Sequence, residues 1–183
     1  QNEIELLKQF ASSGDNNEKL SWDLDNPQSW DRIEWNDEGH VKSIDFTYKW
    51  LTGELDCSAF SELEKLNLYA NSLTGITLNN QKLISINCSY NDLSQNGIDL
   101  SACTNLTELY CDGCSLSTLN LANNPELQTL SCSFNKLFAL NIENNDKLSH
   151  ISCPYNYLDV HEGGNLYNRF TELQSSKNAY VNY

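Results

Sequence analysis

The chain has 183 residues, with 25 acidic and 11 basic side chains and a formal net charge of −14. This charge argues against nucleic-acid binding, because phosphate recognition needs a basic surface. No apolar run reaches the 18 or more residues that a membrane span needs, and with 39% hydrophobic residues the chain is too apolar for disorder.

Residues 1–40 are predicted to form an N-terminal cap. Ile4, Leu7 and Phe10 have helical spacing, and Gly14 follows as a stop signal, so we expect a short amphipathic helix and then a Trp-rich segment. The Trp residues are expected to form the core of this cap rather than a platform for sugars, because large aromatic side chains dominate small cores. They are Trp22, Trp30, Trp35 and Trp50.

The cap region also holds much of the negative charge. Residues 1–64 contain 15 acidic and five basic side chains. A calcium site would need the spacing of a twelve-residue binding loop, which is absent. A solvated acidic surface is therefore expected at Asp23, Asp25, Asp31, Asp37 and Glu38.

From residue 41 onward one apolar pattern recurs. It has the form L-x-x-L-x-L-x-x-N-x-L, as in residues 63–73, and its copies start near residues 41, 63, 83, 106, 127, 148 and 170. The first and last copies are weaker, and the last reads Phe170-x-x-Leu173-x-Ser175. This period predicts a solenoid over residues 41–183, in which each copy contributes one short strand and neighbouring copies bury a shared core.

The ninth position of the repeat predicts an asparagine ladder. A side-chain amide at this position can satisfy backbone groups in the turn that follows the strand. Lys49 and Cys114 interrupt the ladder, which is otherwise expected at Asn71, Asn91, Asn135, Asn156 and Asn178. The return segments are apolar at a two-residue spacing, which favours extended or 3₁₀ structure over a long helix.

These repeats resemble the leucine-rich repeat family over about residues 41–183, and are similar to those of bacterial cell-surface and secreted proteins. The order of helix and Trp-rich segment resembles the N-terminal cap of plant extracellular members, although the cysteine pair of that cap is missing and Trp35 stands where its second cysteine would fall. The resemblance implies an α/β solenoid, an arc with a parallel β-sheet on its concave face, short convex segments and an N-terminal helical cap.

The cysteines all fall on interior positions of the repeat. We expect buried free thiols, which behave as small hydrophobic side chains. The Cys111-x-x-Cys114 pair has no second pair or nearby His to complete a zinc site, and a disulfide between adjacent strands would be strained. No metal or cofactor is expected. The strand column holds Cys88, Cys111, Cys132 and Cys153, and the others are Cys57, Cys103 and Cys114.

Side chains at the third, fifth, seventh and eighth positions are predicted to form the binding surface. The first three point to the concave face when the apolar positions point inward, and the eighth lies where the chain leaves the strand. Most are small and polar, while tyrosines are typical of interfaces. The predicted partner-binding residues are Lys65, Tyr69, Tyr90, Glu108, Tyr110, Asp112, Ser131, Phe134, His150 and Tyr155.

The predicted function is non-catalytic recognition of a protein partner through this face. A carbohydrate-binding module and a structural spacer of a larger bacterial surface protein are the alternatives. For the exit-side aromatics, the alternative to binding is that they only shield the turn and the asparagine ladder. No enzyme is expected, because Glu108 and Asp112 lie roughly 13 Å apart along a strand, beyond the roughly 5–9.5 Å of glycosidase carboxyls. His150 has no acid behind it to complete a catalytic triad.

The predicted location is extracellular or at the cell surface. The chain begins at Gln1 and lacks Met, which is typical of a product whose signal peptide has been removed. Buried free thiols leave a reducing cytoplasm as the alternative. A last strand without a cap would leave an open parallel edge, so we expect either that more chain follows in the native protein or that two copies associate there.

Overall fold

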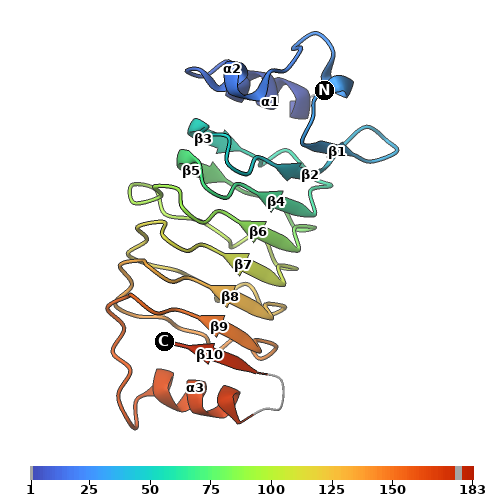
Figure 1. The fold of residues 1–183 in the computed structure, drawn as a ribbon. Helices are drawn as coiled ribbons and strands as arrows, with labels where there is room; N and C mark the ends of the chain where they lie inside the picture. Colours follow the sequence, from blue (N-terminus) through green and yellow to red (C-terminus); the bar gives the residue numbers. More distant parts are fainter. Residues whose placement is uncertain (1, 176–178) are drawn as a thin grey trace.

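The computed structural model describes residues 2–175 and 179–183. It is an elongated solenoid with a column of short strands along one side and helices at both ends (Figure 1). The predicted parallel-sheet solenoid is therefore confirmed. The main sheet has the strand order β1-β2-β4-β6-β7-β8-β9-β10. Its members are β1 (Ile33–Trp35), β2 (Val41–Asp45), β4 (Lys65–Asn67), β6 (Ser85–Asn87), β7 (Glu108–Tyr110), β8 (Thr129–Ser131), β9 (His150–Ser152) and β10 (Tyr180–Asn182).

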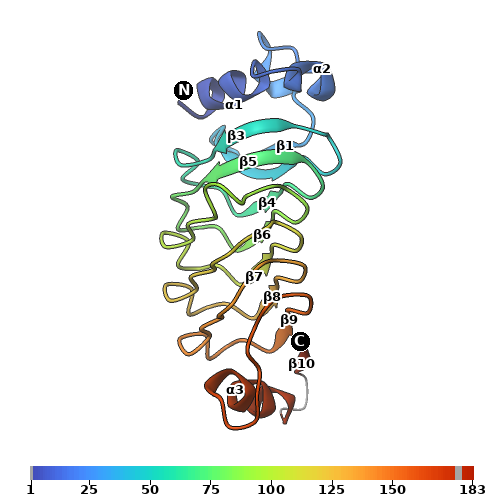
Figure 2. The same ribbon diagram turned by 90° about the vertical axis from the view of Figure 1, so that its left-hand side faces the viewer.

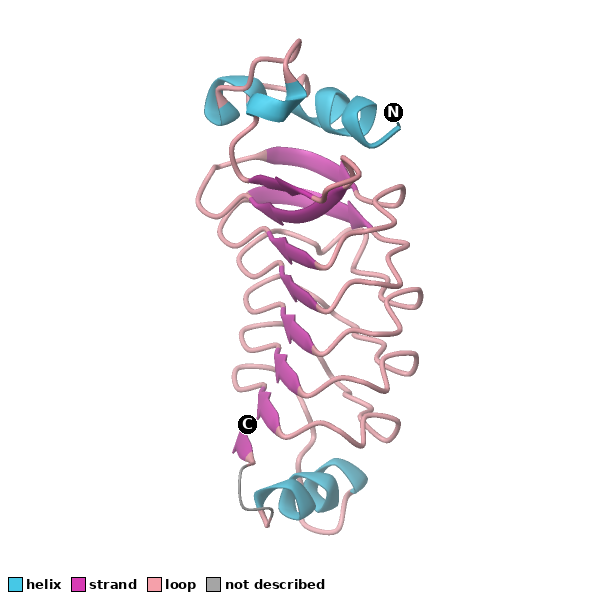
Figure 3. Cartoon of the chain, turned by 90° about the vertical axis from the view of Figure 1, so that its right-hand side faces the viewer, coloured by secondary structure: helices cyan, strands magenta, loops and turns pink. Residues whose placement is uncertain are grey.

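The register of the parallel strands follows the repeat. Ser43 pairs with Lys65, Lys65 with Ser85, and the series continues without a shift to His150 on β9. The strands follow one another in a single column (Figure 3), and the constant register places residues of equal repeat position side by side across the sheet. β1 precedes this series and pairs antiparallel with β2.

A second, smaller sheet lies on the opposite side of the first coils (Figure 2). It contains β3 (Thr52–Asp56) and β5 (Ser72–Thr77), which pair in parallel. In later coils this side of the chain has no assigned strand within the described residues. The apolar alternation still packs inward there, since Leu100, Leu121 and Ile142 are buried.

The N-terminal segment packs onto the first coil. It contains α1 (Asn2–Ala11), α2 (Asn16–Leu20) and the 3₁₀ helix η1 (Pro27–Ser29). The Phe10 ring stacks on Phe46 of the first coil at 6.0 Å between ring centroids. Fully buried Asn16 donates its side-chain amide to the Thr52 carbonyl and accepts the Thr52 N–H. Both an aromatic core and hydrogen bonds therefore join this segment to the repeats.

The tryptophans divide into two groups. Trp22 and Trp30 are buried and stack at 4.5 Å with nearly parallel rings, while Trp35 is half-buried. Trp50 is 69% exposed, so its predicted place in a cap core is wrong. Its position lies in the turn after β2, where the left-handed backbone (φ 57°) turns the side chain outward.

The seventh repeat copy does not form the predicted strand. Residues from Phe170 onward belong to α3 (Asn165–Gln174), whose Phe170 and Leu173 are buried against the end of the core. The spacing Phe170-x-x-Leu173 also suits one face of a helix, and here the helix is what forms. The next strand is β10, which pairs Tyr180 with His150, in the place predicted for Glu172.

The end of the core is covered by a helix, whereas β10 is the last strand of the sheet within the described residues. α3 lies across the end of the core, with Phe170 fully buried (Figure 1). The predicted seventh-copy residues Ser176, Lys177 and Asn178 lie outside the described residues.

The asparagine ladder forms as predicted at four described positions. Each amide donates to a carbonyl in its own coil and to one in the preceding coil, as Asn135 does to Cys132 and Cys111. At the interruption, the Cys114 thiol donates to the carbonyls of Cys88 and Asp112, and the Leu93 N–H bonds the Cys114 backbone carbonyl instead of a side chain. The ladder residues are Asn71, Asn91, Asn135 and Asn156.

Candidate functional site: the sheet face and its exit edge

A row of aromatic side chains follows the edge at which the chain leaves the parallel strands. We call this row the exit edge and define it by Tyr48, Tyr69, Tyr90, Phe134 and Tyr155. Tyr69 makes edge-to-face contacts with Tyr48 at 5.1 Å and with Tyr90 at 5.4 Å. Phe134 and Tyr155 stack at 4.3 Å with 9° between their planes.

The backbone conformation of this row is unusual for bulky residues. The eighth position of every described coil from β2 to β9 is left-handed, with φ between 54° and 62°. Such a conformation costs a residue with a side chain roughly 1–2 kcal/mol, and glycine avoids this cost. Only Gly113 avoids it here, while Tyr48, Tyr90, Phe134 and Tyr155 hold large rings at the left-handed position.

Exposure shows that these rings are not part of the core. Tyr48 is 61% exposed, Phe134 is 52% and Tyr155 is 71%. Four bulky side chains in strained backbone positions, with much of their surface in water, are unfavourable for folding alone. Strain of this kind is concentrated at functional sites.

The row is interrupted by Gly113, which makes room for its neighbour. A side chain at Gly113 would place its Cβ 2.8 Å from the Tyr90 ring. The Tyr90 ring therefore lies against the Gly113 backbone. Because Gly113 has no side chain, the tyrosine of the preceding coil can pack over this position.

Replacing Tyr155 with Asn is expected to change the free energy of unfolding by less than about 1 kcal/mol. The lost stacking on Phe134 is worth roughly 0.5–1.5 kcal/mol, and Asn accepts left-handed backbone more readily than tyrosine, so the two effects offset each other. Urea denaturation measures the difference. A loss above about 2 kcal/mol would instead show that the ring shields Asn156 and has a structural role.

A hollow of about 330 Å³ lies on the concave face, between β2, β4, β6 and β7. Predicted binding residues Lys65 and Tyr110 line it, together with Asn67 and Asn87. Burial and the neighbouring Glu108 charge raise the pKa of the Tyr110 hydroxyl, and the hydrogen bond with Tyr48 raises the pKa of Tyr69. Both tyrosines are thus protonated donors at neutral pH.

The polar residues predicted farther along the sheet bond mainly to one another. Asp112 accepts hydrogen bonds from the Ser131 hydroxyl at 2.8 Å and from Ser133 N–H at 2.7 Å. Glu108 accepts from Ser85 at 2.9 Å. The His150 ring bonds to Ser149 and, within the described residues, makes no hydrogen bond to Ser131. The ten predicted residues therefore divide into the hollow, the exit edge and this self-bonded stretch of the sheet.

Sequence reasoning missed further exposed aromatic side chains beside the exit edge. Phe138 and Tyr157 stack at 5.0 Å and are 70% and 62% exposed, and Trp50 lies near the start of the row. Their positions hold polar residues in several other copies, so the departure from the repeat was the available signal. Phe138 and Tyr157 widen the aromatic surface at the end nearest α3, whereas Trp50 lies at the opposite end of the row.

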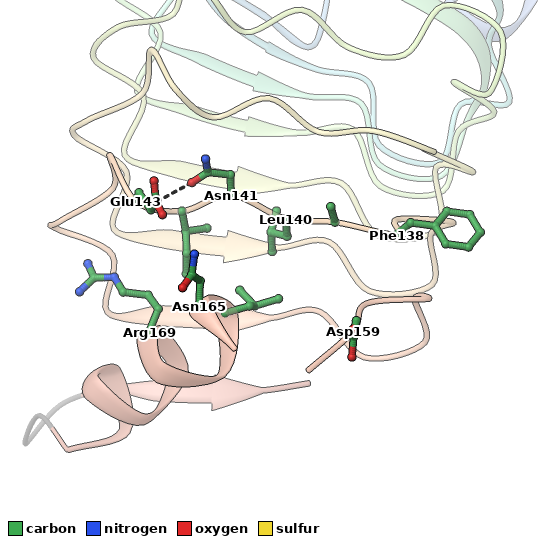
Figure 4. A pocket seen from close by; sticks show the side chains of 10 residues that line it. Phe138, Leu140, Asn141, Glu143, Asp159, Asn165 and Arg169 are labelled. Atoms are coloured by element: carbon green, nitrogen blue, oxygen red, sulfur yellow. Dashed lines mark hydrogen bonds between the residues drawn. The ribbon is translucent and has the colours of Figure 1, made fainter. Parts of the chain in front are cut away.

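Another cavity, of about 340 Å³, lies between residues 138–143 and α3. Figure 4 shows Glu143, Asn141, Asn165 and Arg169 toward one end of it, with Phe138 and Asp159 at the other. The Arg169 guanidinium is engaged by Asp146 and Glu172. Within the described residues, no group of three or more His, Cys, Asp or Glu side chains is placed to hold a metal ion.

All seven cysteines are buried, as predicted from their repeat positions. Burial raises the pKa of Cys111 and Cys132 well above the usual range and that of Cys153 to about 12. The hydrogen bond between Cys88 and Cys114, followed by burial, raises the pKa of Cys88, and the same bond lowers that of Cys114. These thiols belong to the core rather than to the binding surface.

The strand column, the asparagine ladder and the cysteine column together define a solenoid repeat protein of the leucine-rich-repeat-like class. A solved structure with this fold is the functional domain of InlJ from Listeria monocytogenes, which includes a cysteine ladder. The two share 26% sequence identity at a TM-score of 0.52. The match covers 60% of this chain but only 24% of that chain.

No protein-family model matches the sequence, and no curated protein matches it. None of the helices in the part of the chain described here is long and apolar enough to cross a membrane.

Proposed function

We propose that the protein is a recognition module that binds a protein partner with its exit edge and the adjoining concave face. The observation that carries this proposal is the row of exposed aromatic rings held in left-handed backbone conformation. Exposed tyrosines provide large contact areas with little loss of side-chain freedom. The fold similarity to the InlJ domain agrees with an interaction module.

A protein partner fits this edge better than a carbohydrate does. Sugars stack on open aromatic faces, whereas Phe134 and Tyr155 cover one face of each other at 4.3 Å. Tyr69 likewise makes edge-to-face contacts on both sides. Ring edges and tyrosine hydroxyl groups are thus part of the surface that the row presents to solvent, and such a surface suits the irregular apolar and polar surface of a protein.

The test begins with capture of partners by the immobilised wild-type chain and continues with purified candidates. A variant with Tyr90→Asn, Phe134→Asn and Tyr155→Asn should bind the same partner at least tenfold more weakly. A matched variant with Gln95→Asn, Thr118→Asn and Ala122→Asn changes three exposed residues between strands and should bind like the wild type.

Equal binding by the two variants would contradict the proposal. A glycan array probed with the same proteins tests the second candidate function. Glycan binding by the wild type that is lost in the exit-edge variant would favour a carbohydrate-binding module. An extracellular or cell-surface location, and a role without catalysis, remain predictions of the sequence.

A further inference from the structure

Three of the side chains that line the hollow carry donors without a partner among the described residues, and these are Lys65, Asn67 and Asn87. Asn67 and Asn87 occupy equivalent positions on β4 and β6. Each side-chain oxygen accepts a backbone N–H two residues later, from Tyr69 at 3.2 Å and from Ser89 at 3.1 Å. Since the oxygens are held at the strand exit, the two amide nitrogens remain as donors without an acceptor among the described residues.

Lys65 places a charge beside these amides. Seven of the ten Lys and Arg side chains in residues 2–175 and 179–183 form an ion pair with an acid. Lys65 forms none there, although the chain carries more than twice as many acids as bases. An ammonium without a counter-charge in such an acidic protein is complementary to an anionic group from outside.

The acids nearest to Lys65 on the sheet are held by other donors. Asp45 accepts the Thr47 N–H at 3.0 Å and the Thr47 hydroxyl at 2.5 Å. Glu108 accepts from the Ser85 hydroxyl at 2.9 Å. The carboxylates of Asp45 and Glu108 limit the negative charge that a group bound in the hollow can carry. A single carboxylate therefore suits the hollow better than a doubly charged phosphate.

We infer that this hollow receives a carboxylate of the partner protein, from an Asp or Glu side chain, against the Lys65 ammonium and the Asn67 and Asn87 amides. The inference rests on the proposed function and adds to it the chemistry of the bound group. Hydrogen bonds to a charged acceptor are roughly twice as strong as neutral ones, and the Tyr110 hydroxyl adds a further donor at the wall. A basic partner group would be repelled by Lys65.

The experiment uses the whole chain and blocked aspartate, N-acetyl-aspartate N-methylamide, as the probe. Side-chain amide signals of Asn67 and Asn87 are followed by NMR during titration, with blocked asparagine as the neutral probe of equal shape. We expect saturable shifts with the aspartate probe, and about tenfold weaker binding to Lys65→Gln, which corresponds to the loss of one charge-assisted contact.

Lys136→Gln is the matched control, because Lys136 is also exposed, makes no ion pair and lies outside the hollow. It should bind the probe like the wild type. Absence of shifts, equal shifts with blocked asparagine, or equal losses in the two lysine variants would overturn the inference. Binding of cellobiose in place of the aspartate probe would overturn it in favour of a neutral glycan.

The two proposals fail in different ways. Suppose that the exit-edge variant loses partner binding while Lys65→Gln binds the partner like the wild type. The recognition surface then stands, and the carboxylate assignment is wrong. If the aspartate probe titrates the hollow while no partner depends on the exit edge, the carboxylate assignment stands and the proposed function is wrong.

Discussion

Replacing Asn91 with Ala is expected to lower the free energy of unfolding by about 3–5 kcal/mol, since each buried backbone group left unpaired costs roughly 1–3 kcal/mol. Its amide donates to the carbonyls of Leu68 and Cys88, both at 2.9 Å, and its oxygen accepts the Leu73 N–H at 2.9 Å. These groups come from two successive coils, with Leu68 and Leu73 in one and Cys88 in the next, and the side chain is only 4% exposed. Urea denaturation measures the loss.

Asn105→Ala is the control for this prediction. Asn105 also donates to a backbone carbonyl, that of Gln81 at 2.9 Å, but it is exposed. Its replacement should cost less than about 1 kcal/mol, because water can satisfy the group that is released. Similar losses in both variants would contradict the structural role of the ladder.

The second large effect is a loss of stability at alkaline pH. The folded protein raises the pKa of six buried thiols, those of Cys57, Cys88, Cys103, Cys111, Cys132 and Cys153. In the unfolded chain a thiol ionises near about pH 8.5. The stabilisation is therefore fully present below this pH and is lost as the pH rises above it, because unfolding then releases protons.

The size of this alkaline effect follows from the number of thiols. Each loses about 1.4 kcal/mol per pH unit above its unfolded pKa, so six lose several kcal/mol by about pH 10, a large part of a typical total of about 5–15 kcal/mol. Urea denaturation under reducing conditions between about pH 8 and 9.5 should show a steep fall. A flat profile would contradict the presence of buried protonated thiols.

Two variants of β8 and its continuation isolate the thiol contribution. Cys132→Ala removes one titrating group, so the pH slope of the unfolding free energy should become shallower by about 1.4 kcal/mol per pH unit. Leu130→Ala also removes buried volume, since Leu130 is 1% exposed, but it removes no thiol and should leave the slope unchanged.

The solenoid and its register could be predicted because every copy repeats the same spacing. Six strands follow that spacing, and Lys65, Glu108 and His150 consequently lie in one column. The strand predicted for the last copy did not form, because two apolar residues three positions apart fit one face of a helix as well as they fit a strand and its turn. Which of the two forms depends on the end of the core that Phe170 and Leu173 cover.

The second line of asparagines shows another limit of sequence reasoning. Asn80, Asn124 and Asn145 are buried and donate to carbonyls of the preceding coil, as Asn124 does to Leu100 and Cys103. Each stands three residues before the first Leu of the next copy, which was a visible signal. Their role could not be derived from it, because the carbonyls that they bind come together only when the coils stack.

The candidate site was predicted in part. The sequence indicated the exit-side aromatics, but not that they occupy left-handed backbone positions or that some stack with one another. It also placed Lys65 on the concave face without showing that this lysine lacks an ion pair. Contacts of this kind depend on rotamers and on neighbouring coils, which a pattern of residue types does not contain.

The central claim is that a partner protein contacts the exit edge, and site-specific photo-crosslinking tests it most directly. A benzophenone-bearing residue placed at Phe134 or Tyr155 should form a covalent adduct with the partner upon irradiation, because both rings are exposed there. The same residue at Ala122, exposed between strands, should form none. Adducts at Ala122 with none at Phe134 or Tyr155 would contradict the account.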